Sequence, residues 1–254
     1  MAEDGFLADR APIAFAHRGF ADGPARGAEN SMAAFERAVA LGYRYLETDD
    51  RVTADGIALA FHDARLDRVT DRTGVVARLP YSVVKGARIG GREPIPLLTD
   101  VLAAWPSVRV NIDVKSDRGV PATVRAVKKT NSVHRVCVGA FSSRRIAAVR
   151  RALGPQLVTS LGPREVLGLR TGARRRPDRL AGRCAQVPAQ LGRARFVDAR
   201  FVAAAHRAGA PVHVWTVNDR AEMARLLDLG VDGIMTDRAD VLRDLLVSRG
   251  QWRA

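Results

Sequence analysis

The chain has 254 residues, of which 47% are hydrophobic and 27% charged, as is typical of a soluble globular domain; it has no apolar run of the roughly 20 residues that span a membrane and too few cysteines for a disulfide framework. The net charge is +14, and all but four of the 41 basic residues are arginine, so nucleic acid, anionic lipid headgroups and phosphate esters are candidate partners. Because the arginines are scattered and aromatic residues make up only 6% of the chain, too few for a base-stacking surface, we predict no nucleic-acid partner and attribute the charge mainly to a compositional bias toward arginine.

The first segment, residues 1–12, carries the acidic side chains of Glu3, Asp4 and Asp9. It lacks the basic stretch followed by an apolar stretch that marks a secretory signal peptide. We therefore expect a cytoplasmic protein without stable membrane insertion. The sequence leaves the oligomeric state unknown.

Three short apolar runs follow, at residues 13–16, 43–46 and 57–61, and each one ends in polar residues. The polar pairs after the runs are, in order, His17 and Arg18, Glu47 and Asp49, and His62 and Asp63. Apolar runs of this kind predict strands, and α/β folds place reactive residues at the C-terminal ends of parallel strands. We therefore expect the two histidines and the carboxylates to share one site.

A helix is predicted between the first two of these strands, over residues 32–41. Asn30 or Ser31 is the expected N-cap, and Gly42 follows the last turn. The strand, helix and next strand together indicate a βαβ unit.

Glu47 and Asp49 are two residues apart, so their side chains point to the same side of an extended strand. Two neighbouring carboxylates repel each other, and a bound divalent cation such as Mg²⁺ or Ca²⁺ would remove that conflict. The alternative is an exposed strand end with ordinary solvated charges.

Residues 64–96 have weaker apolar periodicity and many turn residues. Loops of this length are uncommon unless they are functional. We therefore predict a small insertion after the second strand region that lies as a lid over the site.

Residues 108–115 alternate strictly between apolar and polar side chains, which predicts a strand. Asn111, Asp113 and Lys115 share one face of it. Asp113 is the expected third metal ligand beside Glu47 and Asp49, and Lys115 is the expected cation near a substrate anion.

Strand-like and helix-like segments alternate through the rest of the chain. Further strands are predicted at residues 135–141, 156–160, 184–187, 211–217 and 230–236, and further helices at 97–105, 120–130, 143–153, 163–171, 198–208, 220–229 and 239–248. The resulting eight βα units predict a single (β/α)8 TIM barrel over residues 1–254. The arginine-rich run 170–183 connects a helix to a strand and is therefore expected on the face opposite the site, and Asp237 is expected to cap the last helix.

Several short motifs recur in a fixed order at the predicted strand ends: H-R-G at residues 17–19, A-E-N-S at 28–31, E-T-D at 47–49, T-A-D-G at 53–56, H-D at 62–63, N-I-D-V-K at 111–115, W-T-V-N at 215–218 and G-V-D-G-I-M-T-D at 230–237. Each is weak alone, but the ordered set resembles the glycerophosphodiester phosphodiesterase family. The resemblance covers nearly the whole chain. Asp113 stands where this family usually has glutamate, which shortens the expected ligand arm by one methylene and leaves the preferred cation open.

The resemblance implies metal-dependent hydrolysis of glycerophosphodiesters to sn-glycerol 3-phosphate and an alcohol. It implies general acid and base roles for His17 and His62, in an order that the sequence leaves open. The implied ligands of the single Mg²⁺ or Ca²⁺ ion are Glu47, Asp49 and Asp113. The implied phosphate- or substrate-binding residues are Arg18, Asn30, Lys115 and Trp215, and the supporting residues are Glu29 and Asp63.

Two other functions stay open. The first is a phospholipase D-like enzyme of the same superfamily that acts on lysophospholipids; the mostly polar residues 64–96 favour a water-soluble substrate instead. The second is a non-enzymatic barrel that binds anions through its basic surface, which would bind less tightly as salt rises and would not need the two histidines.

Overall fold

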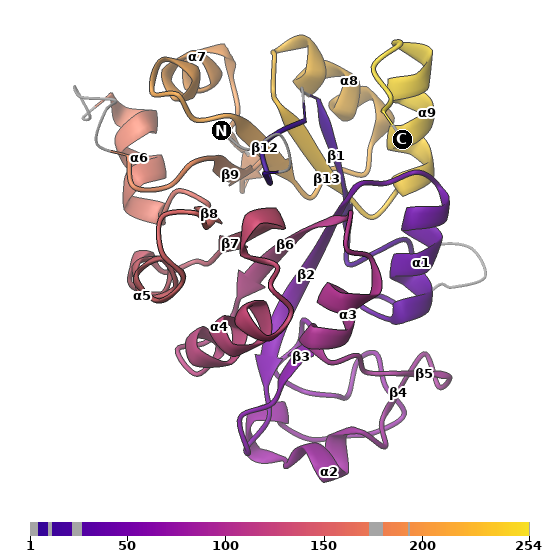
Figure 1. Ribbon diagram of the computed structural model, residues 1–254. Coiled ribbons are helices and arrows are strands. Elements are labelled where there is room, and N and C mark those ends of the chain that lie inside the picture. The colour runs from indigo at the N-terminus through magenta and orange to yellow at the C-terminus, as the bar shows by residue number, and fades with distance from the viewer. Residues whose placement is uncertain (1–4, 10–11, 22–26, 173–179, 193, 254) are drawn as a thin grey trace.

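The computed structural model describes residues 5–9, 12–21, 27–172, 180–192 and 194–253. Parallel strands in the order β8-β7-β6-β2-β1-β13-β12-β9 form the main sheet, and a parallel bridge between Ser160 and Cys184 joins its two ends. The sheet therefore closes into a barrel, and helices surround it (Figure 1). This confirms the predicted (β/α)8 fold.

The barrel strands are β1 (Ile13–His17), β2 (Tyr45–Val52), β6 (Arg109–Val114), β7 (Val136–Gly139), β8 (Val158–Thr159), β9 (Ala185–Pro188), β12 (Val212–Trp215) and β13 (Gly233–Thr236). The helices around them are α1 (Met32–Ala40), α3 (Leu98–Ala104), α4 (Gly119–Lys129), α5 (Ser143–Leu153), α6 (Pro163–Thr171), α7 (Ala199–Arg207), α8 (Arg220–Asp228) and α9 (Ala239–Ser248), with the short 3-10 helix η3 (Val133–Arg135) before β7. The predicted helix ranges agree with these bounds to within one residue at either end. Among the described residues, no helix is both long enough and apolar enough to cross a membrane.

Side-chain caps explain several of the helix starts. The hydroxyl of Ser31 accepts a hydrogen bond from the backbone of Ala34 at the start of α1, so Ser31, one of the two N-caps that the sequence allowed, is the cap. Ser142, Asp198 and Asp219 cap α5, α7 and α8 in the same way. The local sequence therefore sets where these helices begin.

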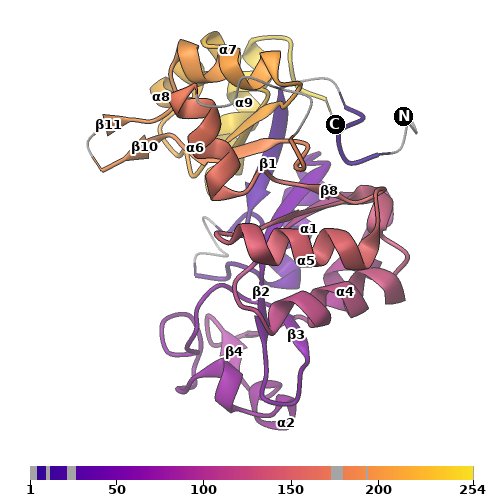
Figure 2. The ribbon, with the colours of Figure 1, turned by 90° about the vertical axis from the view of Figure 1, so that its left-hand side faces the viewer.

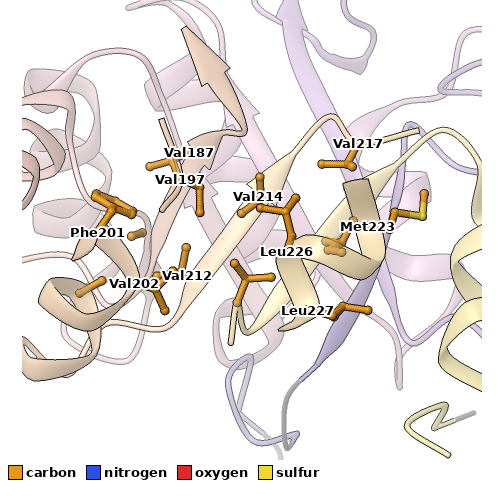
Figure 3. Packing of buried hydrophobic residues seen from close by; sticks show 14 of the residues in the cluster. Val187, Val197, Phe201, Val202, Val212, Val214, Val217, Met223, Leu226 and Leu227 are labelled. Carbon is orange, nitrogen blue, oxygen red and sulfur yellow. The ribbon is translucent and has the colours of Figure 1, made fainter. Parts of the chain in front are cut away.

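Apolar side chains fill the layer between the strands and the helices. Figure 3 shows part of this layer, where Val212 and Val214 of β12 pack with Phe201 of α7 and Leu226 of α8. A separate cluster lies on the inward side of the strands and comprises Phe6, Ile13, Phe15, Tyr45, Cys137, Cys184 and Met235. The two cysteines are buried and free.

The N-terminal segment closes one end of the barrel. The backbone N–H of Phe6 donates to the carbonyl of His134, just before β7, and the hydroxyl of Tyr45 donates to the carbonyl of Phe6. The strands begin at this end, so the opposite end, where they finish, is left for a site.

The strand that delivers His62 is antiparallel, contrary to the expectation for residues 57–61. β3 (Ala58–Ala60) pairs antiparallel with the far end of β2, with Asp50 opposite Ala60. The turn at residues 53–56 is far too short for a parallel crossover, which needs a dozen or more residues. His62 therefore reaches the site from a strand that doubles back along β2.

Residues 64–96 pack beside this hairpin. They contain η2 (Val76–Arg78), α2 (Tyr81–Val84), β4 (Arg88–Ile89) and β5 (Glu93–Pro94), and they share with β3 a hydrophobic cluster that includes Leu59, Phe61, Leu66, Val84 and Ile89. Figures 1 and 2 show them below the barrel, next to β3. We propose that this insertion and the barrel form one domain, because β2 runs through both.

A second insertion, which no sequence pattern indicated, lies between β9 and α7. β10 (Gln190–Leu191) and β11 (Ala194–Arg195) form an antiparallel hairpin that projects from the barrel in Figure 2. Residues 173–179 of the arginine-rich run lie outside the described residues, so its predicted place is left as an expectation.

Candidate active site

A cavity of about 490 Å³ opens where the barrel strands end. Its polar wall includes His17, Arg18, Glu47, Asp49, His62, Asn111, Asp113 and Lys115. Its apolar wall includes Phe141, Leu161, Val166, Leu167, Leu191, Phe196 and Trp215. The cavity thus combines charged groups at the strand ends with an apolar side from the loops.

Three predicted site residues, Glu29, Asn30 and Asp63, are not among the residues that line this cavity. The insertion is also absent from it: every residue from 64 to 96 is described, and none lines the cavity. The prediction of a lid from this segment is therefore wrong. Its apolar residues face their own cluster against β3, and this holds the segment to the side of the barrel.

His17 ends β1 and is held between two carboxylates. Its Nδ1 lies 2.6 Å from Oδ1 of Asp237, and its Nε2 lies 3.7 Å from Oε2 of Glu47. Burial alone would lower the pKa of His17, but Glu47 and Asp237 outweigh it and raise the pKa above its ordinary value. The histidine is thus favoured in its protonated form.

Asp237 is the residue whose predicted role is wrong. The cap position of α9 is Arg238, whereas Asp237 binds His17 and also accepts from Nδ2 of Asn218 at 2.8 Å. Asn218 holds this loop further, because its Oδ1 accepts from the backbone N–H of Asp237. The sequence did contain a sign of this role, because Asp237 directly follows the end of a predicted strand at Thr236. His17 lies at the end of β1 in the same way, so both positions belong to the end of the barrel where the site lies.

His62 has a matching arrangement. Its Nδ1 lies 2.6 Å from Oδ1 of Asp63. Nε of Arg68, from the insertion, donates to Oδ2 of Asp63 at 2.6 Å, and this arginine also binds Glu29, with Nη2 to Oε1 at 2.7 Å. The sequence did not indicate a role for Arg68, because the residues next to it in the chain do not show that it contacts Asp63 and Glu29 in the fold.

The pKa of His62 is shifted in the direction opposite to that of His17. Burial lowers the pKa of His62, against the opposing effect of Asp49. The hydrogen bonds from Arg68 hold the pKa of Asp63 down at about 2. The neutral form of His62 is therefore favoured, beside an ionised Asp63.

Glu47 and Asp49 lie side by side on β2, as predicted, and both are almost fully buried. Nζ of Lys115 lies 2.7 Å from Oδ1 of Asp49 and 2.6 Å from Oδ2 of Asp113. Burial and the charge of Asp49 raise the pKa of Glu47, while Lys115 and Arg18 overcome the effect of burial and lower the pKa of Asp49. As they stand, no three His, Cys, Asp or Glu side chains of the described residues are close enough together to hold a metal ion.

Arg18 and Asn30 both have left-handed backbone, with φ of 56° and 59°, an uncommon state that often marks functional sites. The backbone N–H of Asn30 donates to the carbonyl of Arg18. The side chain of Asn30 donates to Asp49 and accepts from the hydroxyl of Thr48. Asn30 therefore lies behind the cavity wall and positions Asp49.

The guanidinium of Arg18 faces the cavity and is steadied by Glu29, whose Oε1 accepts from Nη1 at 2.9 Å. Its Nε lies 3.3 Å from Oδ2 of Asp49 but has no hydrogen-bond acceptor among the described residues. A buried donor without an acceptor is costly, and the nearby charge of Asp49 offsets part of that cost.

Asp50 points away from the cavity, on the other face of β2. It accepts hydrogen bonds from the backbone N–H of Lys115 and from the hydroxyl of Thr123. Burial raises its pKa to about 6. A Cβ added to Gly119 would lie 2.4 Å from its carboxylate, so Asp50 joins β2 to the start of α4.

Trp215 ends β12 and contacts Phe141, with ring centroids 5.6 Å apart and planes at 75°. Both rings belong to the apolar side of the cavity. The other histidines are not in its lining: His213 is buried against Phe15, and His206 binds Asp232.

Residues 17–241 match the model of the Glycerophosphoryl diester phosphodiesterase family. The chain is 42% identical to the probable glycerophosphodiester phosphodiesterase 2 of Mycobacterium tuberculosis, over 97% of this chain and 95% of that protein. A solved glycerophosphodiester phosphodiesterase from Agrobacterium tumefaciens is similar with a TM-score of 0.73 and 24% identity, over 92% of this chain and 99% of that one. A phosphodiesterase from Oleispira antarctica, solved with the product sn-glycerol-3-phosphate, is similar with a TM-score of 0.77 and 21% identity, over 93% of this chain and 97% of that one.

Proposed function

Because the chain belongs to the glycerophosphoryl diester phosphodiesterase family, we propose that it hydrolyses glycerophosphodiesters to sn-glycerol 3-phosphate and an alcohol. The observation that carries this proposal is the pair of histidines, His17 and His62, which line one cavity and each have Nδ1 at 2.6 Å from an aspartate. An aspartate at Nδ1 fixes the tautomer and leaves Nε2 for proton transfer to or from a substrate.

We assign the acid and base roles from the two environments. His62, with its lowered pKa, removes a proton from the attacking group. In the net reaction that group is a water molecule. A new P–O bond forms, the P–O bond to the alcohol breaks, and His17, with its raised pKa, gives its proton to the leaving oxygen. The atoms balance as diester plus water to phosphomonoester plus alcohol.

The substrate phosphate is an anion and would be repelled by the carboxylates of the cavity, so positive groups must hold it there. Arg18 offers a planar guanidinium that suits phosphate oxygens, and it lines the cavity. Lys115 supplies a second positive charge on the cavity wall. We assign Asn30, Glu29 and Asp63 to positioning, and Trp215 to the wall against which the glycerol moiety packs.

The carboxylates are of the chemical type that a divalent metal ion binds, and they would have to move closer together to hold one. Asp49 and Asp113 already converge on one cation, the ammonium of Lys115. Burial, and after it the charge of Asp49, raises the pKa of Glu47, and a further cation would oppose this effect. We propose Glu47, Asp49 and Asp113 as ligands of Mg²⁺ or Ca²⁺. When bound, the ion would neutralise charge on the phosphate oxygens.

One observation favours lysophospholipids as a second candidate substrate, through phospholipase D-like cleavage. Phe141, Leu167 and Leu191 line the cavity, yet they are 70%, 60% and 58% exposed. The polar character of residues 64–96 had argued for a water-soluble substrate, but that segment does not cover the cavity. The loops that do cover it present apolar side chains, which suit an acyl chain.

The test is release of glycerol 3-phosphate from glycerophosphocholine, with and without EDTA. His17→Ala and His62→Ala are expected to lose activity by about 10²–10⁴-fold, and EDTA is expected to abolish it. The matched control is His206→Ala, because His206 also binds an aspartate but lies away from the cavity. Turnover of lysophosphatidylcholine alone would favour the second candidate, and no turnover of either substrate with Mg²⁺, Ca²⁺ or Mn²⁺ would favour a barrel that only binds anions.

A further inference from the structure

The large hydrophobic side chains that remain exposed are not spread evenly over the described residues. Phe141, Leu167 and Leu191 all line the cavity, while Val83 and Val247 lie elsewhere. The three come from separate segments: the loop after β7, helix α6 and the β10–β11 hairpin. Exposed apolar side chains that gather at one place mark a contact surface more often than scattered ones do.

Two exposed arginines accompany these side chains. Arg164 lies three residues before Leu167 on α6, so both project from neighbouring positions on one helix face. Arg144 lies in the first turn of α5, just after Phe141. Both helices begin where barrel strands end, which places the arginines on the side of the molecule where the cavity opens.

The charge of these arginines is only partly compensated. The guanidinium of Arg144 is 85% exposed and lies 3.4 Å from the exposed carboxylate of Asp117, which also binds Arg145. Arg164 makes no ion pair with any residue that the structure describes. We call Phe141, Leu167, Leu191, Arg144 and Arg164 together the rim.

We propose that the rim docks on the surface of an anionic phospholipid membrane. Apolar side chains would enter the boundary between headgroups and acyl chains, and the arginines would meet the anionic headgroups. The cavity would then open toward the lipid, from which a lipid-derived diester could enter without crossing bulk water. This is peripheral contact through side chains and does not involve insertion of a helix.

A lipid surface fits the rim better than a protein does. The apolar residues come from three separate segments, and an arginine lies close in the chain to two of them, Phe141 and Leu167; such a pattern suits a fluid surface that adapts to each segment. The net charge of +14 favours an anionic surface further. The proposal concerns where the enzyme works, so it is tested by binding and does not depend on which diester is cleaved.

The experiment is co-sedimentation of the full chain with phosphatidylcholine vesicles, with and without phosphatidylglycerol. The wild type is expected to bind the vesicles that contain phosphatidylglycerol, and less so as salt rises. Phe141→Ser/Leu167→Ser/Leu191→Ser should lower the partition coefficient roughly tenfold or more. Arg144→Gln/Arg164→Gln should lower it by about fivefold per arginine, only when phosphatidylglycerol is present.

The matched control is Val83→Ser/Val247→Ser, which removes exposed apolar side chains away from the rim and should bind as the wild type does. Leu191→Ser alone, on the hairpin, keeps the test valid if the triple variant folds poorly. A wild type that stays in the supernatant would overturn the proposal. Equal binding by the rim variants and the wild type would also overturn it, because the contact would then depend on net charge alone. A wild-type dimer that forms as concentration rises, and that the rim variants no longer form, would overturn it too, because the rim would then bind a second copy of the chain.

Discussion

Nδ1 of His17 lies 2.6 Å from Oδ1 of Asp237, although 220 positions separate the two residues in the chain. They meet because β1 and β13 are neighbours in the closed barrel, with Ala16 paired to Thr236. The contact holds the imidazole with Nε2 toward Glu47. It also contributes to the raised pKa of His17.

Replacement of Asp237 by Asn is therefore expected to lower kcat by roughly 10- to 1000-fold while the chain stays folded. Loss of the carboxylate also lowers the pKa of His17. If His17 is the acid, the alkaline limb of the pH–rate profile should move to lower pH. The control is Asp232→Asn, because Asp232 binds His206 in a similar pair outside the cavity. An unchanged kcat and profile in Asp237→Asn would exclude the proposed role.

The sequence was sufficient to predict many of the residues that line the cavity, because its signals were local. Alternation along β6 put Asp113 and Lys115 on one face, and both line the cavity. The spacing of Glu47 and Asp49 put them on one side of β2. These relationships depend on the geometry of a single strand, which a short stretch of sequence specifies.

The residues that the sequence misplaced depend on contacts between distant segments. Asp237 was expected to cap α9, but its partner is on the opposite end of the chain. Arg68 lies in a stretch without clear periodicity, and its role is visible only once Glu29 and Asp63 are brought beside it. The prediction of a lid was wrong because the apolar residues of the insertion pack against β3 in the folded protein. They show no regular period along the sequence, so this packing could not be predicted from it.

Arg68 ties the insertion to the site, so Arg68→Met is expected to lower kcat about tenfold. Asp63 would lose the hydrogen bonds that keep its pKa near 2, and it would take up a proton at higher pH. The acid limb of the pH–rate profile should then move to higher pH, which a purely structural defect would not cause. Arg65→Met is the control, since Arg65 pairs with the exposed Asp67 outside the cavity. Identical profiles for the two variants would argue against this role.

The ammonium of Lys115 occupies the space between Asp49 and Asp113. Lys115→Met would remove the cation shared by the buried Asp49 and the partly exposed Asp113, and would leave Asp49 with its ion pair to Arg18. The cost in the free energy of unfolding should therefore lie below the roughly 3–5 kcal/mol of breaking a fully buried pair. A divalent ion should restore part of this loss, because binding to the folded state alone stabilises it. We expect Mg²⁺ or Ca²⁺ to raise the Tm of Lys115→Met more than that of the wild type, and to have less effect on Asp113→Asn. A Tm that responds to neither ion in any of the three chains would contradict the proposed ligands.

Asp50 should make stability depend on pH. The folded protein keeps the proton on this buried carboxyl up to about pH 6, whereas an unfolded chain releases it near pH 4. The folded state therefore binds more protons between these values, and the free energy of unfolding falls as pH rises, by up to about 3 kcal/mol. Asp50→Asn should remove the part of this fall that Asp50 contributes, as measured by urea unfolding at several pH values, while the part from Glu47, whose pKa burial also raises, should stay. Asp244→Asn, which changes an exposed carboxylate, should retain it, and a parallel pH dependence in all three chains would show that Asp50 is not its source.

Gly19 and Gly27 form a matched pair that separates backbone strain from crowding, since both have φ of +83°. A Cβ on Gly19 would lie 2.7 Å from the backbone carbon of Ala34 in α1, whereas a Cβ on Gly27 would meet nothing within 4 Å. Gly27→Ala should cost only the left-handed backbone penalty of about 1–2 kcal/mol. Gly19→Ala adds a clash with a helix backbone that cannot rotate away, so it should cost at least about 2 kcal/mol more. Since Gly19 follows Arg18, relief of the clash would also displace that guanidinium and raise KM. Equal unfolding free energies for the two variants would mean that α1 moves freely, and that the close approach of Gly19 and α1 does not fix Arg18.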